Sequence, residues 1–362
     1  MRWVFAAVML VHGLIHLMGF LKAFGIAELP QLKRPIGKPM GVVWLAACAA
    51  VLATIVVSLV WPADAWMIGV AALVLSQVAI VSSWSDAKFG TLANAILFVA
   101  VLVNFLSEGP TSFPAQMREE VTRELARPQD APVVTEADLA PLPAPVRRYV
   151  RATGFVGQPR VHNYRLHFRG RLRTGPDAAW MPFEVEQQSF ARPSARYFLM
   201  RASMFGVPAQ AYHRFAGQAS MRVVIAGLYP MVDERGPEMD RAETVTLFND
   251  MCILAPGTLI DPAIAWEPAG DRTAHARFTH GAHTIRATLL FDEQGLLADF
   301  VSDDRSRSER EGRFTTPVRN YRSYGPNRIA SYGEAHWHPP EGEYSYGEFE
   351  LVDIAYNVRV AD

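Results

Sequence analysis

Apolar residues are distributed along this chain in two different ways. Residues 3–107 contain four long stretches without charge, whereas beyond residue 160 apolar and polar residues alternate in short runs. A helix needs about 20 apolar residues to cross the roughly 30 Å hydrocarbon core of a bilayer, and alternation with a period of two is typical of half-buried strands. The sequence therefore predicts a membrane-spanning helical part followed by a β-rich part.

The uncharged stretches predict transmembrane helices, because a backbone in lipid must satisfy its hydrogen bonds internally. Tryptophan residues lie near most of the predicted ends, where indole rings favour the membrane interface. The four predicted helices are Trp3–Leu21, Pro39–Ala63, Ala65–Ser85 and Phe89–Ser107.

The basic residues of the short loops predict how these helices are oriented. The first loop carries Lys22, Lys33, Arg34 and Lys38, the second carries none, and the third carries Lys88. Basic loops stay in the cytoplasm, so both chain termini and the β-rich part are expected outside it, at the inner membrane of a bacterium. A cleaved signal peptide ending near residue 27 is the alternative, but cleavage would leave the basic first loop outside.

The β-rich part begins with a clear alternation. In Tyr164–Arg169 the apolar side chains face one way, and the arginines and His167 face the other. Gly, Pro, Asp and Asn separate the runs that follow, which predicts an antiparallel meander forming a curved sheet or half-barrel. Further strands are predicted at Phe183–Phe190, Ala195–Ala202, Gln210–Phe215, Ser220–Ala226, Thr273–Thr279, Thr284–Phe291, Leu296–Ser302, Asn320–Tyr324, Ile329–Trp337 and Phe349–Asn357.

One amphipathic helix interrupts the strands. Residues Asp240–Leu254 place Val245, Phe248 and Cys252 on one side at helical spacing, and Pro256 follows. Such a helix is expected to cover the concave face of the sheet. The chain thus divides into a four-helix transmembrane domain (1–107), a linker with a short helix (108–141) and an extracytoplasmic antiparallel β domain (142–362).

Composition supports this division. The whole chain is 50% hydrophobic with a net charge of -1, but residues 1–106 hold only six of the 35 Lys and Arg and three of the 36 Asp and Glu. The helical part therefore carries +3 and the remainder -4. This balance excludes a single soluble domain, a disordered chain and a strongly basic nucleic-acid-binding protein.

His12 and His16 lie at i, i+4 on one face of the first predicted helix. Polar residues inside a membrane are costly and are therefore candidates for function. Two histidines at this spacing could hold a metal or a haem, although the other helices offer no further His or Glu as a ligand. Hydrogen bonding between helices is the simpler interpretation.

Other chemistry-bearing motifs are weak. His336 and His338 share one face of a strand, which is more typical of surface histidines than of a zinc site. No phosphate-binding loop, nucleophile elbow or dinucleotide fingerprint occurs. The sequence therefore favours a protein that is not an enzyme and predicts no cofactor.

Four short motifs together resemble a family of bacterial membrane proteins known only as a domain of unknown function. They are Leu142–Gly154, Leu254–Trp266, Asp303–Arg305 and Asp353–Asn357. The resemblance implies a C-terminal β-rich domain, similar in fold to the half-barrel cups that carry lipoproteins and lipids in the periplasm. It implies no chemistry, because the family has none assigned.

The leading hypothesis is a multi-pass membrane protein whose extracytoplasmic sheet binds a lipid or another hydrophobic ligand. Asn249, Asp250, Trp266 and Arg305 are the candidate ligand-binding residues, placed on or near the amphipathic helix. One alternative is a metal- or haem-dependent membrane enzyme or redox protein using His12 and His16. Another is an envelope scaffold that binds a protein partner.

Overall fold

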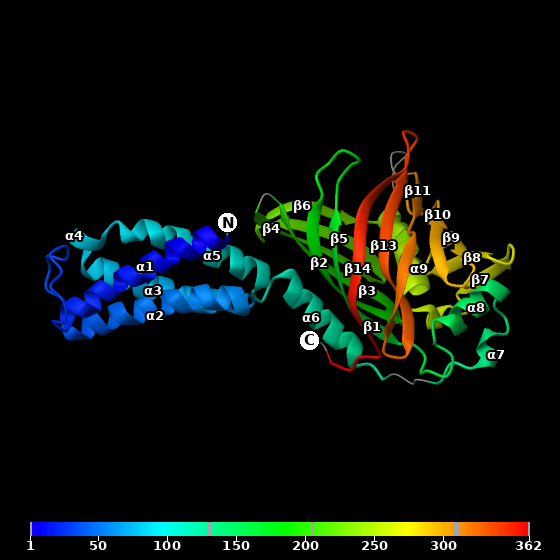
Figure 1. The fold of residues 1–362 in the computed structure, drawn as a ribbon, viewed down its shortest axis with the longest axis horizontal. Coiled ribbons are helices and arrows are strands. Elements are labelled where there is room, and N and C mark those ends of the chain that lie inside the picture. Colours follow the sequence, from blue (N-terminus) through cyan, green and yellow to red (C-terminus); the bar gives the residue numbers. More distant parts are fainter. Residues whose placement is uncertain (1, 129–131, 205, 307–311, 361–362) are drawn as a thin grey trace. The chain divides into compact units, whose positions relative to one another are not determined.

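The computed structural model describes residues 2–128, 132–204, 206–306 and 312–360 (Figure 1). The chain forms two compact units. The first comprises Met1–Gln116 with Ala226–Tyr229 and is helical, and the second comprises Met117–Ile225 and Pro230–Asp362 and contains the sheet.

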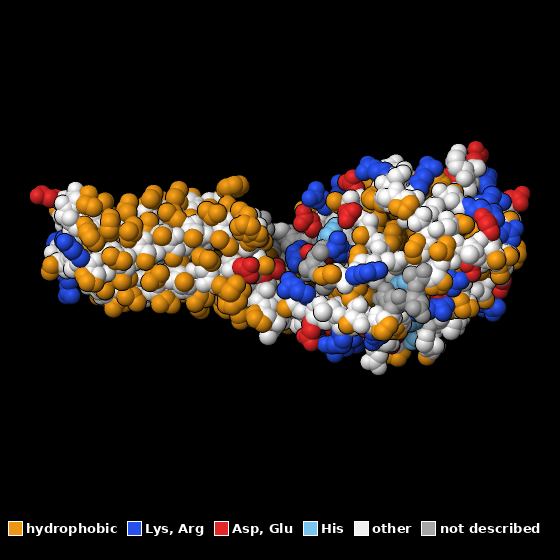
Figure 2. Space-filling model, turned by 90° about the horizontal axis from the view of Figure 1, so that it is seen from below, with side chains coloured by type: hydrophobic (Ala, Val, Ile, Leu, Met, Phe, Trp, Pro, Cys, Tyr) orange, Lys and Arg blue, Asp and Glu red, His pale blue; other side chains and the backbone are white. Residues whose placement is uncertain are grey.

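The helical unit contains four helices that are long and apolar enough to cross a membrane. They are α1 (Arg2–Ala23), α2 (Lys38–Val60), α3 (Ala65–Ser82) and α5 (Gly90–Glu108), with the short α4 (Trp84–Ala87) between the last two. Hydrophobic side chains cover their outer surface (Figure 2), as expected for helices surrounded by lipid. The four predicted apolar helices are confirmed.

Local chemistry sets two details of these helices. Helix α2 stops at Val60 instead of the predicted Ala63, because Pro62 has no backbone N–H and restricts the residue before it. Helices α1 and α2 pack closely at Gly19, where an added Cβ atom would lie 2.1 Å from the ring of Trp44.

Three helices precede the sheet in the chain. They are α6 (Phe113–Leu125), α7 (Glu136–Leu139) and α8 (Ala144–Ala152). Glu120 of α6 accepts hydrogen bonds from the Tyr212 hydroxyl and from Nε of Arg214, both at 2.9 Å. These contacts hold α6 against the outer face of the sheet.

The second unit is built on one antiparallel sheet of 14 strands in the described residues. The first six strands form a meander, and eight more form a second series. They are β1 (Asn163–Leu172), β2 (Met181–Ala191), β3 (Ser194–Met204), β4 (Val207–Ala216), β5 (Gln218–Ile225), β6 (Tyr229–Arg235), β7 (Ile264–Pro268), β8 (Thr273–His280), β9 (His283–Phe291), β10 (Leu297–Ser302), β11 (Arg313–Thr315), β12 (Val318–Tyr324), β13 (Asn327–His338) and β14 (Tyr344–Tyr356).

The order of the strands explains how the sheet curves around a helix. Strands β6 and β7 are the two ends of the sheet, and the first strand β1 pairs with the last strand β14 in its middle. Helix α9 (Pro237–Leu254) connects β6 to β7 and contacts β5 on one side and β9 and β10 on the other. The helix therefore lies across the concave face, here called the inner face (Figure 1). The predicted curved antiparallel sheet with a covering helix is confirmed.

The main core lies between α9 and the second series of strands. Phe248 of α9 stacks on Phe278 of β8, with ring centroids 5.1 Å apart, and contacts Phe300 of β10. The end of α9 is fixed by two tyrosines, since the hydroxyl of Tyr149 donates to the carbonyl of Cys252 and that of Tyr356 donates to the carbonyl of Leu254. This packing fixes which side chains of α9 face the first strands.

Candidate functional site

A cluster of buried charges lies between α9 and the inner face of β2, β3 and β4. Arg196 of β3 donates from Nε to Oδ2 of Asp250 at 2.7 Å and from Nη1 to Oε2 of Glu243 at 3.3 Å. Gln187 of β2 donates to the same Asp250 oxygen at 2.7 Å. We call Gln187, Arg196, His213, Glu243 and Asp250 the charged cluster.

The cluster keeps Glu243 ionised although its side chain is only 3% exposed. Burial would raise the pKa of Glu243, but a hydrogen bond with His213 and the charges of Arg196 and Arg305 outweigh burial and lower the pKa to about 2. Nδ1 of His213 lies 3.4 Å from Oε1 of Glu243. The carboxylate is therefore fully compensated by neighbouring groups.

A second apolar cluster lies beside these charges on the inner face. Its side chains come from β1, β2, β3 and β14, and no described residue of α9 belongs to it. Three of its members are buried and five are only half-buried. We call it the apolar wall, and it consists of Phe168, Leu172, Phe183, Val185, Phe198, Met200, Ala202 and Phe349.

Phe198 joins the apolar wall to the charged cluster. The guanidinium carbon of Arg196 lies 4.6 Å from the centroid of the Phe198 ring, and the ring of His213 packs edge-on against the same ring at 5.5 Å. Phe349 contacts Phe168 and Phe183 further along the wall, at 5.6 and 5.0 Å. The inner face therefore passes directly from charge to an aromatic and aliphatic surface.

Arg305 borders the charged cluster next to Glu243 of α9. Its Nε donates to the hydroxyl of Thr246 on α9 at 3.1 Å. Its guanidinium carbon stands 4.3 Å from the ring centroid of Phe314 and 5.1 Å from that of Trp337, an arrangement in which the cation is stabilised by the ring faces. Arg305 is half-buried and faces the same interior as Glu243.

The structure brings together two of the four residues predicted as ligand-binding. Asp250 joins the charged cluster and Arg305 borders it. Asn249 is buried and donates to the Thr316 hydroxyl at 2.6 Å. Trp266 lies on β7 against Phe248, and its indole N–H donates to the carbonyl of Leu259. Asn249 and Trp266 thus lie apart from the apolar wall.

Sequence reasoning missed the central residues of this site. Arg196 shares its strand face with Phe198 and Met200, and Gln187 shares its face with Phe183 and Val185. A charged or amide side chain in the apolar phase of an alternating strand has to be paired inside the fold. The other phase of β3 is equally apolar and carries Arg201 beside Tyr197 and Leu199, so the sequence pattern alone did not distinguish Arg196 from Arg201.

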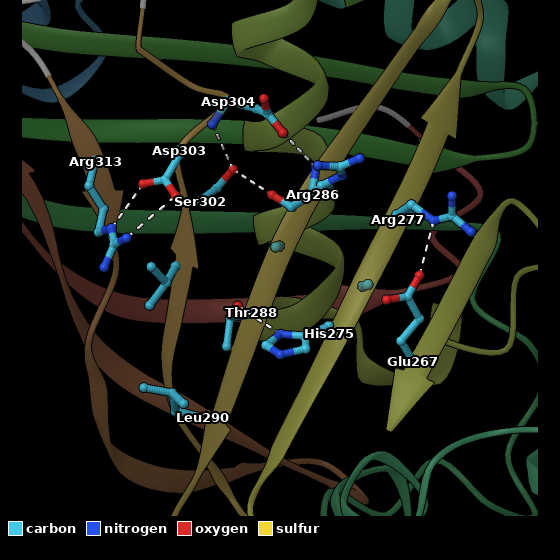
Figure 3. A pocket seen from close by; sticks show the side chains of 13 residues that line it. Glu267, His275, Arg277, Arg286, Thr288, Leu290, Ser302, Asp303, Asp304 and Arg313 are labelled. Carbon is cyan, nitrogen blue, oxygen red and sulfur yellow. Dashed lines mark hydrogen bonds and ion pairs between the residues drawn. The ribbon is translucent and has the colours of Figure 1, made fainter. Parts of the chain in front are cut away.

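The outer face of the second strand series carries a different feature. A groove of about 640 Å³ is lined by residues of β7 to β11 and of the turn after β10, and Figure 3 shows the side chains that line it. Its charges are largely paired, since Arg277 contacts Glu267 at 3.3 Å and Arg313 contacts Asp303 at 2.9 Å. The groove therefore carries as many acidic as basic side chains.

The histidines His336 and His338 also lie on the outer face. His336 places its Nε2 at 3.0 Å from Glu334 and its Nδ1 at 2.5 Å from Glu343, and His338 lies 2.9 Å from the hydroxyl of Thr315. Among the described residues, no group of three His, Cys, Asp or Glu side chains is arranged to hold a metal ion.

His12 and His16 form part of a buried polar network in the helical unit. Nε2 of His12 lies 3.1 Å from the Ser76 hydroxyl and 3.0 Å from Oδ1 of Asn94, and Nε2 of His16 lies 2.7 Å from the same hydroxyl. Asn94 donates to Gln77 at 2.9 Å, which turns its Oδ1 toward His12. The network joins α1, α3 and α5 by hydrogen bonds, which is how buried polar residues often connect membrane helices.

Residues 132–349 match a family described as "Family of unknown function (DUF6544)". The family resemblance predicted from the four short motifs is thereby confirmed. No curated protein matches the chain in sequence.

Several solved structures resemble the chain at low sequence identity. A proposed outer membrane lipoprotein-sorting protein domain from Vibrio parahaemolyticus is 10% identical, with a TM-score of 0.35 over 55% of this chain and 87% of that chain. A DUF1329 family protein from Desulfovibrio piger is 12% identical, with a TM-score of 0.35 over 56% and 88%. A LolA superfamily protein from Nitrosomonas europaea is 10% identical, with a TM-score of 0.31 over 63% and 95%. At these scores the likeness supports no conclusion about function.

Proposed function

The chain belongs to the family of unknown function DUF6544, and we propose that its curved sheet binds a lipid or another hydrophobic ligand on the inner face. The observation that carries this proposal is the apolar wall. Five of its eight side chains remain half-buried, and two of these, Phe168 and Phe349, also pack against the main core between α9 and the second series of strands. Half-exposed apolar side chains that line a concave surface are typical of ligand-binding sites.

We further propose that the chain is a multi-pass protein of a bacterial inner membrane and that the sheet unit lies outside the cytoplasm. The four apolar helices support membrane insertion, and the basic residues of the first loop support the orientation. A ligand-binding surface attached to membrane helices would remain close to a source of lipid.

The outer face gives less support to the alternative of a protein-binding scaffold. Its groove is lined by paired charges (Figure 3), whereas the central part of a protein interface is usually depleted of charge. A hydrophobic ligand on the inner face is therefore better supported than a protein partner on the outer face.

The full chain, purified in detergent and incorporated into nanodiscs, can be tested with a photoactivatable fatty acid. We expect cross-links in peptides of β1 to β3 and β14, identified by mass spectrometry. Met200→Asp places a charge on the apolar wall and is expected to reduce cross-linking about tenfold or more, since a charge there is costly beside an apolar chain. Val352→Asp, at a position that is 46% exposed, is the matched control.

Equal labelling of wild type and of the Met200→Asp variant would contradict the proposal. The same holds if the cross-links map only to the helical unit, because that pattern reflects a probe dissolved in the surrounding lipid. Circular dichroism of both variants shows whether the sheet is retained.

A further inference from the structure

We propose that the ligand of the inner face carries an anionic headgroup, a carboxylate or a phosphate, which Arg305 and His213 hold beside the apolar wall. This inference rests on the proposed function, because it names the class of ligand that the same surface takes. It follows from the positions of the charged side chains around the apolar wall. The family is of unknown function and assigns no ligand.

The two carboxylates of the site are buried together with Arg196. The side chains of Glu243 and Asp250 are 3% and 12% exposed, and both contact Arg196, which is 7% exposed. His213 is 20% exposed and Arg305 is half-buried. Among the described residues of the site, Arg305 therefore presents a positive charge toward the inner surface, while the carboxylates of Glu243 and Asp250 are paired with Arg196.

Arg305 is held in a position suited to an anion. Only the Nε of Arg305 donates to Thr246, and Thr246 is the one hydrogen-bond partner of Arg305 among the described residues. The rings of Phe314 and Trp337 support the guanidinium plane. A guanidinium presents its terminal N–H groups as a fixed fork that matches the two oxygens of a carboxylate or phosphate.

His213 places a second polar group at the same boundary. Its Nδ1 faces Glu243, and its ring packs on Phe198 of the apolar wall. An amphiphile with its chain along Phe198 and Met200 would carry its headgroup toward His213 and Arg305. A cationic headgroup there would meet Arg305 and be repelled, and a neutral one would leave its guanidinium without an anion.

The test compares headgroups on one chain. Full-length protein in nanodiscs of neutral phosphatidylcholine is titrated with a diazirine-bearing fatty acid, with the alcohol and the trimethylammonium analogue of the same chain, and with the corresponding lysophosphatidate. Apparent affinity is read from cross-links to peptides within residues 163–356. Measuring only these peptides excludes probe that is bound around the membrane helices.

We expect at least one of the two anionic probes to bind about tenfold or more tightly than the alcohol, as expected for a charge-assisted hydrogen bond. Arg305→Gln and His213→Gln should each reduce this preference, measured as the ratio of the affinities for the anionic probe and for the alcohol. Arg286→Gln and His275→Gln change the same residue types on the outer face (Figure 3) and should retain the preference. The stronger of the two anionic probes identifies a carboxylate or a phosphate as the headgroup.

Two results overturn the inference while leaving the proposed function intact. One is equal affinity for all headgroups with cross-links on the apolar wall. The other is a loss of acid and alcohol binding together in Arg305→Gln, which shows a role in packing alone. If no probe cross-links to the sheet unit, the proposed function itself fails.

Discussion

At the scale of single residues, the charged cluster is the most sensitive part of the sheet unit. Replacing Glu243 by Gln should lower the free energy of unfolding by about 3 kcal/mol at pH 7, because Arg196 loses one of its two buried partners. Thermal unfolding of the full chain in detergent measures the change. Glu184→Gln removes a partner from an exposed pair with Arg169 and should cost no more than about 0.5 kcal/mol.

Acid should remove the difference between wild type and Glu243→Gln. The folded-state pKa of Glu243 is about 2, below the ordinary value of 4.5. The stability that its ionised form provides is therefore present above pH 4.5 and is lost as the pH falls toward 2. A Glu243→Gln effect that stays constant from pH 7 to pH 3 would contradict this assignment.

Asp299 on β10 should behave in the opposite way. Burial raises its pKa to about 6 from 3.8, although the backbone N–H groups of Phe300 and Thr316 donate to it. A raised pKa means that the carboxyl favours folding most below pH 3.8 and that this contribution is lost as the pH rises through 6. Asp299→Asn should therefore stabilise the chain by up to about 3 kcal/mol at pH 8 and hardly at all at pH 3.5.

Melting curves across this pH range measure the Asp299→Asn effect. Asp303→Asn is the control, since Asp303 is exposed and pairs with Arg313 on the surface. A variant that is less stable than wild type at pH 8 would show that the Asp299 carboxylate is needed in its charged form.

The residues of the site were only partly predictable from sequence. Asp250 could be predicted because it lies on the amphipathic helix that interrupts the strands. Arg305 could be predicted because it belongs to the Asp303–Arg305 motif. Glu243 could not be predicted as a site residue, because from Ala242 onward nearly every side chain of α9 is buried and none stands out from its neighbours. Its role depends on Arg196, 47 residues away, and no local pattern reports such a pairing.

At the scale of elements, periodicity predicted the regular strands and missed the irregular ones. Strand β6 is exposed along most of its length and shows no alternation, β7 has five residues, and β11 has three. Strand β6 has no buried side chain of its own and exists because β5 pairs with it, whereas β7 and β11 are too short to show a period. The four long helices were predictable because the absence of charge is a property of each segment by itself.

Helix α1 should depend on its two histidines for attachment to the other helices. His12→Ala and His16→Ala should each destabilise the detergent-solubilised chain by about 1–2 kcal/mol. The double variant should lose less than the sum, because both side chains contact the Ser76 hydroxyl. Val11→Ala, on the exposed side of α1, should change stability little.

The same samples decide whether His12 and His16 hold a metal or a haem, as the alternative hypothesis requires. We expect elemental analysis to find no stoichiometric metal and the optical spectrum to show no Soret band. Either signal, if lost in the His16→Ala variant, would establish the metal- or haem-dependent alternative in place of a hydrogen-bonding role.

At the scale of the whole molecule, the proposed orientation can be tested with single cysteines. Both natural cysteines, Cys48 and Cys252, are buried, so background labelling should be low. A membrane-impermeant maleimide added to spheroplasts should label Glu341→Cys directly and Lys33→Cys only after the membrane is permeabilised. The reverse pattern would place the sheet unit in the cytoplasm.

The pairing of β1 with β14 determines when the sheet can be completed during synthesis. Tyr164 is opposite Tyr356 in this pair, so one edge of β1 stays unpaired until the ribosome has made the residues up to Tyr356. An unpaired strand edge readily joins other strands and leads to aggregation. If the sheet unit is exported, β1 must cross the membrane before its partner β14 exists. Nascent chains of this protein are therefore expected to need a chaperone on the side where the sheet folds.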